Sequence, residues 1–147
     1  MHAQLLPHAQ ILQPVVALIA WTLVMLVWML TTRLGAMRRA GVDMGKLVGT
    51  RGSDADGKLP PGAQWKAHNY NHLLEQPVLF YALCIVIALS TADHPVNTAF
   101  AWIYVALRVA HSLVQATVNR VQPRFLLFAA STVVLAGLTL HASMAVF

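Results

Sequence analysis

Charged residues are scarce in this chain of 147 residues: they make up 10% of it, with ten Lys and Arg against five Asp and Glu. A soluble domain carries about 25% charged residues. Hydrophobic residues account for 58% of the sequence, and the mean hydropathy is +0.62. This composition excludes an ordinary soluble domain and predicts an integral membrane protein.

Cysteine is nearly absent too. Cys84, the only one in the sequence, stands in an apolar run, so it forms no internal disulfide and has no CxxC partner for a metal site. The sequence also has no glycine-rich nucleotide-binding loop and no HExxH motif. We therefore interpret Cys84 as a packing residue and find no motif of a common soluble enzyme.

Four segments are long and apolar enough to be membrane spans, because about 18 apolar residues in a helix cross the hydrocarbon core. The predicted spans are residues 11–32, 66–90, 96–118 and 125–147. Between the first two lies a connection rich in glycine and mixed charge, residues 35–62, which we expect to form a loop at the membrane surface. The sequence thus predicts one all-α domain over residues 1–147, an integral membrane four-helix bundle.

The basic residues are clustered. Seven of the ten Lys and Arg lie between Arg33 and Lys66, and the third connection carries Arg120 and Arg124. The net charge of +5 could suggest a nucleic-acid partner, but basic residues beside spans follow the positive-inside rule. We therefore predict no nucleic-acid binding, basic connections in the cytoplasm and both termini outside it. The short loops favour a bacterial inner membrane.

Two predicted spans carry polar residues at helical spacing. In the second span these residues follow i, i+3, i+4 and i+7: His68, Asn71, His72 and Glu75. In the third span they follow i, i+3, i+7 and i+11: Arg108, His111, Gln115 and Asn119. Such spacing places each set on one face of its helix.

Glu75 and Arg108 lie at similar depths, roughly 15 and 18 Å from the cytoplasmic ends of their spans. Charges at such depth face the bundle interior and pair, so we expect these two residues to pair. The pair could merely orient two helices, but the number of polar groups favours a cavity open to the cytoplasm. Pro77 is expected to kink the second span just past Glu75.

The spacing of His68, His72 and Glu75 would also allow a metal ligand set on one helix face. Histidines in a polar stripe are more often hydrogen-bond partners. We therefore predict no metal site.

Two motifs resemble those of a known family. They are the run Asn71–Tyr81, with the sequence NHLLEQPVLFY, and the run Arg108-Val109-Ala110-His111 followed by Arg120-x3-Arg124. The chain resembles the MAPEG family, the membrane-associated proteins of eicosanoid and glutathione metabolism, over nearly its whole length. The resemblance implies a homotrimer that holds glutathione, as a cosubstrate, between neighbouring subunits near the cytoplasmic side.

The resemblance also implies roles for individual residues. Arg124 would stabilise the glutathione thiolate, since a nearby cation lowers a thiol pKa. The residues that would line the glutathione pocket are Lys66, His68, Asn71, His72, Glu75, Arg108, His111, Gln115 and Arg120.

The function that follows is a glutathione S-transferase or peroxidase acting on lipophilic electrophiles that arrive from the membrane lipid. Two alternatives stay open: a non-catalytic lipid-binding protein, and a structural subunit of a larger membrane complex. His68 and His72 stand where glutathione-binding members have arginine and asparagine, and this departure favours the lipid-binding alternative.

Overall fold

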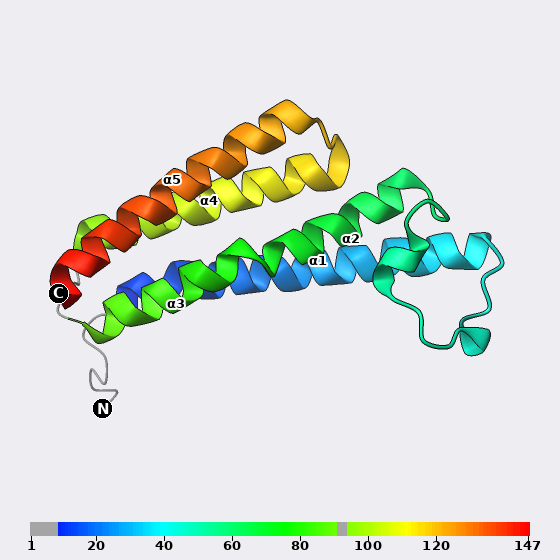
Figure 1. The fold of residues 1–147 in the computed structure, drawn as a ribbon, viewed down its shortest axis with the longest axis horizontal. Coiled ribbons are helices and arrows are strands. Elements are labelled where there is room, and N and C mark those ends of the chain that lie inside the picture. Colours follow the sequence, from blue (N-terminus) through cyan, green and yellow to red (C-terminus); the bar gives the residue numbers. More distant parts are fainter. Residues whose placement is uncertain (1–8, 91–93) are drawn as a thin grey trace.

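The computed structural model describes residues 9–90 and 94–147, and every regular element in these ranges is helical. Residues 91–93, where we placed part of the second connection, lie outside the described ranges, as do residues 1–8. Five α-helices and three short 3-10 helices follow one another along the chain (Figure 1). They are η1 (Ala9–Ile11), α1 (Leu12–Arg39), η2 (Met44–Lys46), η3 (Gly52–Ala55), α2 (Pro61–Leu73), α3 (Gln76–Leu89), α4 (Pro95–Thr117) and α5 (Val121–Val146).

Four helical segments of the described chain are long and apolar enough to cross a membrane: Leu12–Arg39, Pro61–Leu89, Pro95–Thr117 and Val121–Met144. The second of these consists of α2 and α3 together. The prediction of an all-helical chain with four helical segments long and apolar enough to be spans is thereby confirmed for the described residues. α1 differs from expectation at its end, because the helix continues through Arg33 to Arg39. Charge ends the membrane-embedded stretch but not the helix, since arginine is a good helix former in water.

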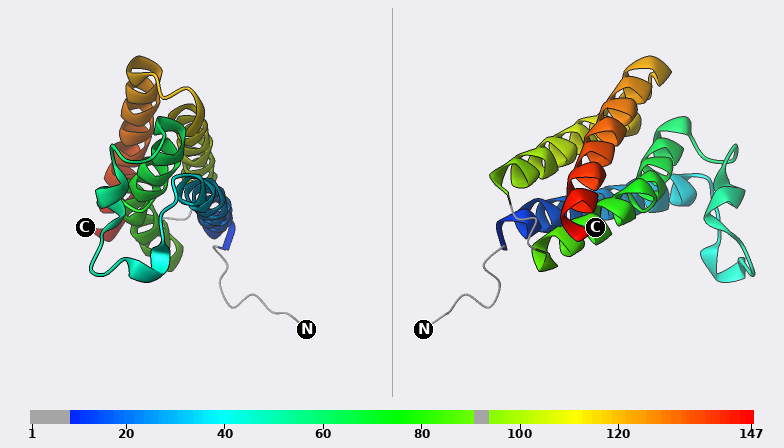
Figure 2. Two further views of the ribbon diagram at one scale, coloured as in Figure 1. Left: turned by 90° about the vertical axis from the view of Figure 1, so that its right-hand side faces the viewer. Right: turned by 60° about the vertical axis from the view of Figure 1, so that its left-hand side comes forward.

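The helices form two layers. α1 lies alongside α2 and α3, and α4 pairs with α5, as Figure 1 shows. α4 also packs against both α1 and α2, and α5 packs against α3; the right-hand view of Figure 2 shows α5 inclined to the direction of α1. Phe80 on α3 stacks on Tyr104 of α4, with ring centroids 4.4 Å apart, at the centre of the apolar core. Other buried members of this core are Ile11, Leu18, Met25, Leu73, Cys84, Ile87 and Leu138.

The second span is interrupted at its midpoint. α2 ends at Leu73, and Glu75 has φ −89° and ψ −94°, outside the helical region. Pro77 explains the break, because proline has no N–H to donate to the carbonyl four residues earlier. The expected kink near Pro77 is therefore present, and it leaves backbone carbonyls of the last turn of α2 without their helical donors.

The two basic connections lie at the same end of the bundle. Figure 1 shows the connection between α1 and α2 on the same side as the turn between α4 and α5, while the start of α1 and the end of α5 lie at the opposite end. Asn119, in the second of these connections, has φ 52°. Asparagine tolerates this left-handed conformation better than most residues, which allows a tight turn of three residues between the helices.

Candidate functional site

The buried face of α4 carries the largest group of polar side chains in the described core. Its members are Asn97, Arg108, His111, Ser112 and Gln115. The last four lie at i, i+3, i+4 and i+7, so they form one stripe along the helix. Arg108 is 0% exposed, which makes it the largest fully buried side chain. A charged side chain inside an apolar bundle requires polar partners, because each buried unpaired charge is costly.

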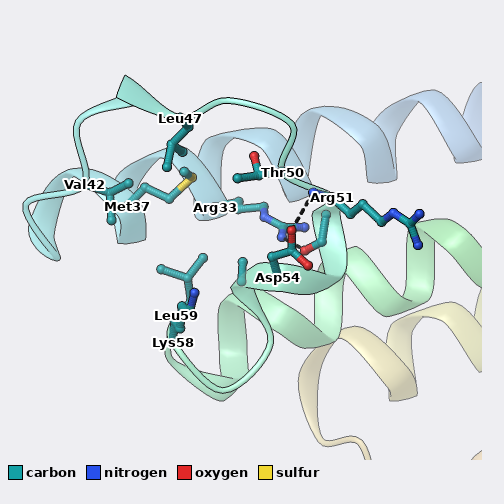
Figure 3. Close-up of a pocket in the computed structure, with 11 residues that line it drawn as sticks. Arg33, Met37, Val42, Leu47, Thr50, Arg51, Asp54, Lys58 and Leu59 are labelled. Atoms are coloured by element: carbon teal, nitrogen blue, oxygen red, sulfur yellow. Dashed lines mark hydrogen bonds between the residues drawn. The ribbon is translucent and has the colours of Figure 1, made fainter. Parts of the chain in front are cut away.

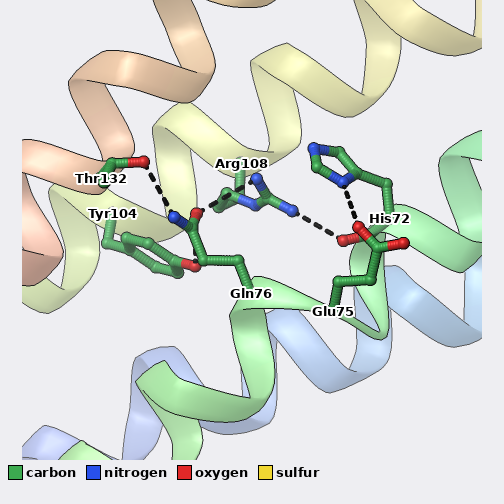
Figure 4. A network of polar contacts seen from close by, with 6 residues as sticks. All are labelled: His72, Glu75, Gln76, Tyr104, Arg108 and Thr132. Atoms are coloured by element: carbon green, nitrogen blue, oxygen red, sulfur yellow. Dashed lines mark hydrogen bonds and ion pairs between the residues drawn. The ribbon is translucent and has the colours of Figure 1, made fainter.

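Arg108 finds these partners on the second span (Figure 4). Its Nη2 donates to the main-chain carbonyl of His72 at 2.9 Å, and its Nη1 donates to Gln76 Oε1 at 3.4 Å. The Tyr104 hydroxyl donates to the same Gln76 oxygen at 3.4 Å, and Gln76 Nε2 donates to Thr132 Oγ1 at 2.8 Å. This network joins α2, α3, α4 and α5 through one glutamine and one arginine.

The break in the second span is what makes the network possible. In an unbroken helix the carbonyl of His72 would accept from the N–H of Gln76. The chain leaves the helical conformation at Glu75, and the guanidinium of Arg108 bonds the His72 carbonyl instead. A charged donor thus satisfies a carbonyl that the kink exposes, and such charge-assisted bonds are stronger than neutral ones.

The expected direct pair of Glu75 with Arg108 is wrong. Glu75 Oε2 lies 2.9 Å from His72 Nδ1, and the Glu75 side chain is 67% exposed on the outside of the chain. Glu75 acts on Arg108 only as a longer-range charge. The helical break explains the difference, because the turn at residue 75 changes the direction in which the side chain leaves the helix. Spacing along an ideal helix cannot anticipate that change.

His72, His111 and Phe128 form a ring cluster beside the network. The ring centroid of His72 lies 4.9 Å from that of His111 and 5.4 Å from that of Phe128 on α5, while His111 and Phe128 are 6.4 Å apart. The cluster brings together side chains from α2, α4 and α5, and Phe128 lies one helical turn after Arg124 on α5.

Arg124 is half-buried in the first turn of α5. Its Nη1 donates to Asn119 Oδ1 at 2.6 Å, so the left-handed asparagine both forms the turn and holds this guanidinium. The neighbouring Arg120 is exposed.

The predicted site residues of α2 are spread around the helix. Lys66 places its ammonium 5.0 Å from the ring centroid of Trp28, which is a cation–π contact. His68 Nε2 lies 3.2 Å from Asp56 Oδ2 in the preceding connection. Three residues of α2 and the break are exposed, and we call them the outer polar face: His68, Asn71 and Glu75.

The structure therefore divides the predicted residues into an inner and an outer group. Arg108, His111 and Gln115 are buried on α4, with His72 half-buried against them, whereas the outer polar face is exposed. Among the described residues, no three His, Cys, Asp or Glu side chains gather in a way that could hold a metal ion.

Several contributors to the polar core were missed by the sequence analysis. Gln76 and Thr132 belong to the Arg108 network, and buried Asn69 donates to Ser112 Oγ at 2.7 Å. At the other end of the bundle, His141 Nδ1 lies 2.7 Å from Asn97 Oδ1. Gln76 and Asn69 could have been suspected, because each adds a polar group to a span that already carries several. Thr132 could not, since a threonine in a span usually bonds its own helix.

These features define a class of protein: an integral membrane bundle of four spans, with a buried arginine and histidine cluster at the break in its second span. The MAPEG family matches residues 11–144, nearly the whole chain, and the protein belongs to this family. No curated protein and no solved structure gives a significant match to the chain.

Proposed function

We propose that the protein is a membrane-bound glutathione S-transferase or peroxidase that acts on lipophilic electrophiles as a homotrimer. Family membership supports a role connected with glutathione or eicosanoids. Glutathione would be the cosubstrate, bound at the outer polar face, while the buried Arg108 and His111 of α4 would position the groups that contact it. Arg124 would stabilise the thiolate formed when the thiol releases its proton to solvent. The thiolate would attack the electrophile arriving from the bilayer, and the new carbon–sulfur bond would replace the bond to the leaving group, which departs with its electron pair.

The exposure of Glu75 is the observation that carries this proposal. The residue lies midway along the span Pro61–Leu89, yet its side chain is 67% exposed in the single chain. A charge facing lipid at that depth costs about 2.5–3.5 kcal/mol or more. The outer polar face must therefore be shielded from lipid. A second copy of the chain, with a polar ligand at the interface between the two subunits, would shield it.

The chemistry of glutathione suits such a boundary. The tripeptide carries two carboxylates and an ammonium group, so it needs both cations and an anion from the protein. Glu75 offers a carboxylate, while Lys66 and Arg120 offer cations at the basic end. Arg124, held by Asn119, would lie where a thiol can lose its proton to form the nucleophile.

A non-catalytic lipid-binding role is the second candidate, and one observation favours it. Both terminal nitrogens of Arg108 are already used by protein acceptors, and the side chain is fully buried. An arginine whose two terminal nitrogens are bonded in this way stabilises the fold without a ligand on either of them. In that case the outer polar face would bind lipid headgroups or another subunit.

Ultraviolet absorbance of the thiolate separates these candidates. Glutathione added to the purified protein is expected to ionise in stoichiometric amounts, and Arg124→Ala is expected to abolish the signal and lower the conjugation rate roughly 100-fold, as for loss of one stabilising donor. Arg39→Ala is the matched control, because Arg39 is exposed at the end of α1, and it should retain both properties.

Other results would contradict the proposal. If glutathione neither binds nor ionises while lipid copurifies with the protein, the lipid-binding candidate is favoured. Stoichiometric copurification of different protein chains would indicate a structural subunit of a larger complex. Cross-linking of the protein in membranes should yield a trimer, and a monomer would leave Glu75 facing lipid and overturn the proposed site.

A further inference from the structure

The connection between α1 and α2 is folded onto the end of the bundle and encloses a cavity (Figure 3). A small apolar cluster of Ala36, Leu59 and Ala63 fixes it to α1 and α2. Gln64 Nε2 donates to the carbonyl of Leu59 at 2.7 Å, and a guanidinium nitrogen of Arg33 donates to the carbonyl of Gly52. This segment is therefore not a simple surface loop, although its composition suggested one.

The cavity has a volume of about 270 Å³. Typical small-molecule pockets measure about 300–1,000 Å³, so this one suits a fragment the size of a lipid headgroup and not a whole lipid. Its lining combines apolar side chains, among them Met37, Val42 and Leu47, with the three cations Arg33, Arg51 and Lys58 and the single carboxylate Asp54. The excess of cations over carboxylates, beside an apolar wall, complements an anionic amphiphile.

The position of the cavity agrees with this chemistry. Arg33 is the first charged residue after the uncharged run of α1, so the cavity begins where the hydrocarbon core ends. α1 extends beyond it by roughly 9 Å to Arg39, at 1.5 Å per residue. This length covers one headgroup layer, which is about 5–8 Å thick. Basic pockets beside spans on the cytoplasmic side bind anionic headgroups, because that leaflet is enriched in negatively charged lipid.

We propose that this cavity binds the headgroup of an anionic phospholipid from the leaflet at the basic end of the bundle. Lys58 would contact the phosphate, with the positive charge of Arg33 beside it, while Met37, Val42 and Leu47 would contact the glycerol and first methylenes. Figure 3 shows the Arg51 side chain extending away from the other lining groups, so Arg51 is left out of the contact set. This site is separate from the proposed glutathione site on α2 and α4, and either could exist without the other.

Two matched pairs of substitutions test the proposal. Lys58→Gln is compared with Lys46→Gln, and Arg33→Gln with Arg38→Gln. Each pair removes the same charge from the same basic region, but only the first member lines the cavity. Binding of phosphatidylglycerol to the full chain in a neutral detergent is measured by native mass spectrometry and by the shift in Tm. Phosphatidylcholine serves as the zwitterionic control.

The wild-type protein should retain phosphatidylglycerol in saturable fashion and show a rise in Tm that phosphatidylcholine does not produce. Lys58→Gln is expected to weaken binding roughly five-fold, because one cation near an anionic headgroup contributes about that much. Lys46→Gln should change binding less than two-fold. If Arg33→Gln loosens the connection by losing its bond to Gly52, the lysine pair still decides the question.

Three outcomes would overturn the proposal. Equal weakening by Lys58→Gln and Lys46→Gln would show a diffuse basic surface instead of a site. If phosphatidylcholine binds as tightly as phosphatidylglycerol, the site does not require an anionic lipid. Displacement of the lipid by millimolar glycerol phosphate or inorganic phosphate would show that a soluble anion fills the cavity and that the apolar wall has no part in recognition.

Discussion

Arg108 places a positive charge among apolar helices, yet none of the carboxylates in the described part of the chain forms an ion pair with it. Its terminal nitrogens bond the His72 carbonyl and the Gln76 amide oxygen, while its Nε has no partner in the described chain. Arginine suits this position because its planar guanidinium has two terminal nitrogens, which donate at the same time to two acceptors on different helical turns. The residue thus stabilises the kink directly, and its contribution to any ligand site comes through the groups that it positions.

Arg108→Lys tests this role. A lysine side chain ends in one nitrogen, so it cannot bond the His72 carbonyl and the Gln76 side chain at the same time. We expect the variant to lose roughly 1.5–3 kcal/mol of stability, the value of one hydrogen bond to a charged group, seen as a lower Tm in detergent. Arg39→Lys at an exposed position is the control and should leave Tm unchanged. An unchanged Tm for Arg108→Lys would mean that the network does not support the bundle.

At the scale of single residues, the sequence predicted which polar residues lie in the core better than it predicted the direction in which their side chains point. The helical spacing placed Arg108 and His111 on one buried face of α4, and both are buried there. The same reasoning placed Glu75 opposite Arg108, and this pairing is wrong. Spacing rules assume an unbroken helix, and residue 75 is the point at which the helix breaks.

Among the elements, the second span differs most from an ideal helix. α2 and α3 are separated by Leu74 and Glu75, and Pro77 follows in the first turn of α3. The break creates the acceptor for Arg108 and turns Glu75 outward. Pro77 therefore determines both the hydrogen-bond network of Arg108 and the outward direction of Glu75.

Pro77→Ala is expected to restore a donor to the carbonyl of Leu73 and extend the helix through residue 75. Hydrogen exchange followed by mass spectrometry should show slower exchange across residues 74–79. Pro95→Ala is the matched control: Pro95 is the first residue of α4, where an N–H has no partner within the helix, so exchange there should not change. Unchanged exchange in Pro77→Ala would mean that the Arg108 network holds the break without the proline.

At the scale of the whole molecule, the two basic connections lie at one end of the bundle, as Figure 1 shows. The positive-inside rule predicts that this end faces the cytoplasm. Single cysteines at Ser53 and Phe147, introduced into Cys84→Ala, provide a test. A membrane-impermeant thiol reagent should label Ser53→Cys only from the cytoplasmic side and Phe147→Cys only from the other side. Labelling of both from one side would contradict the three spans between residues 53 and 147.

The sequence by itself determined that the protein is helical, has four spans and belongs in a membrane, because these properties depend on local composition and length. It also identified most of the polar residues, since a charge or histidine is conspicuous in an apolar span. The tertiary structure decided which of them meet. The partner of Arg108, the outward direction of Glu75 and the cavity beside α1 depend on a helical break and on packing between distant segments, and neither follows from periodicity along one helix.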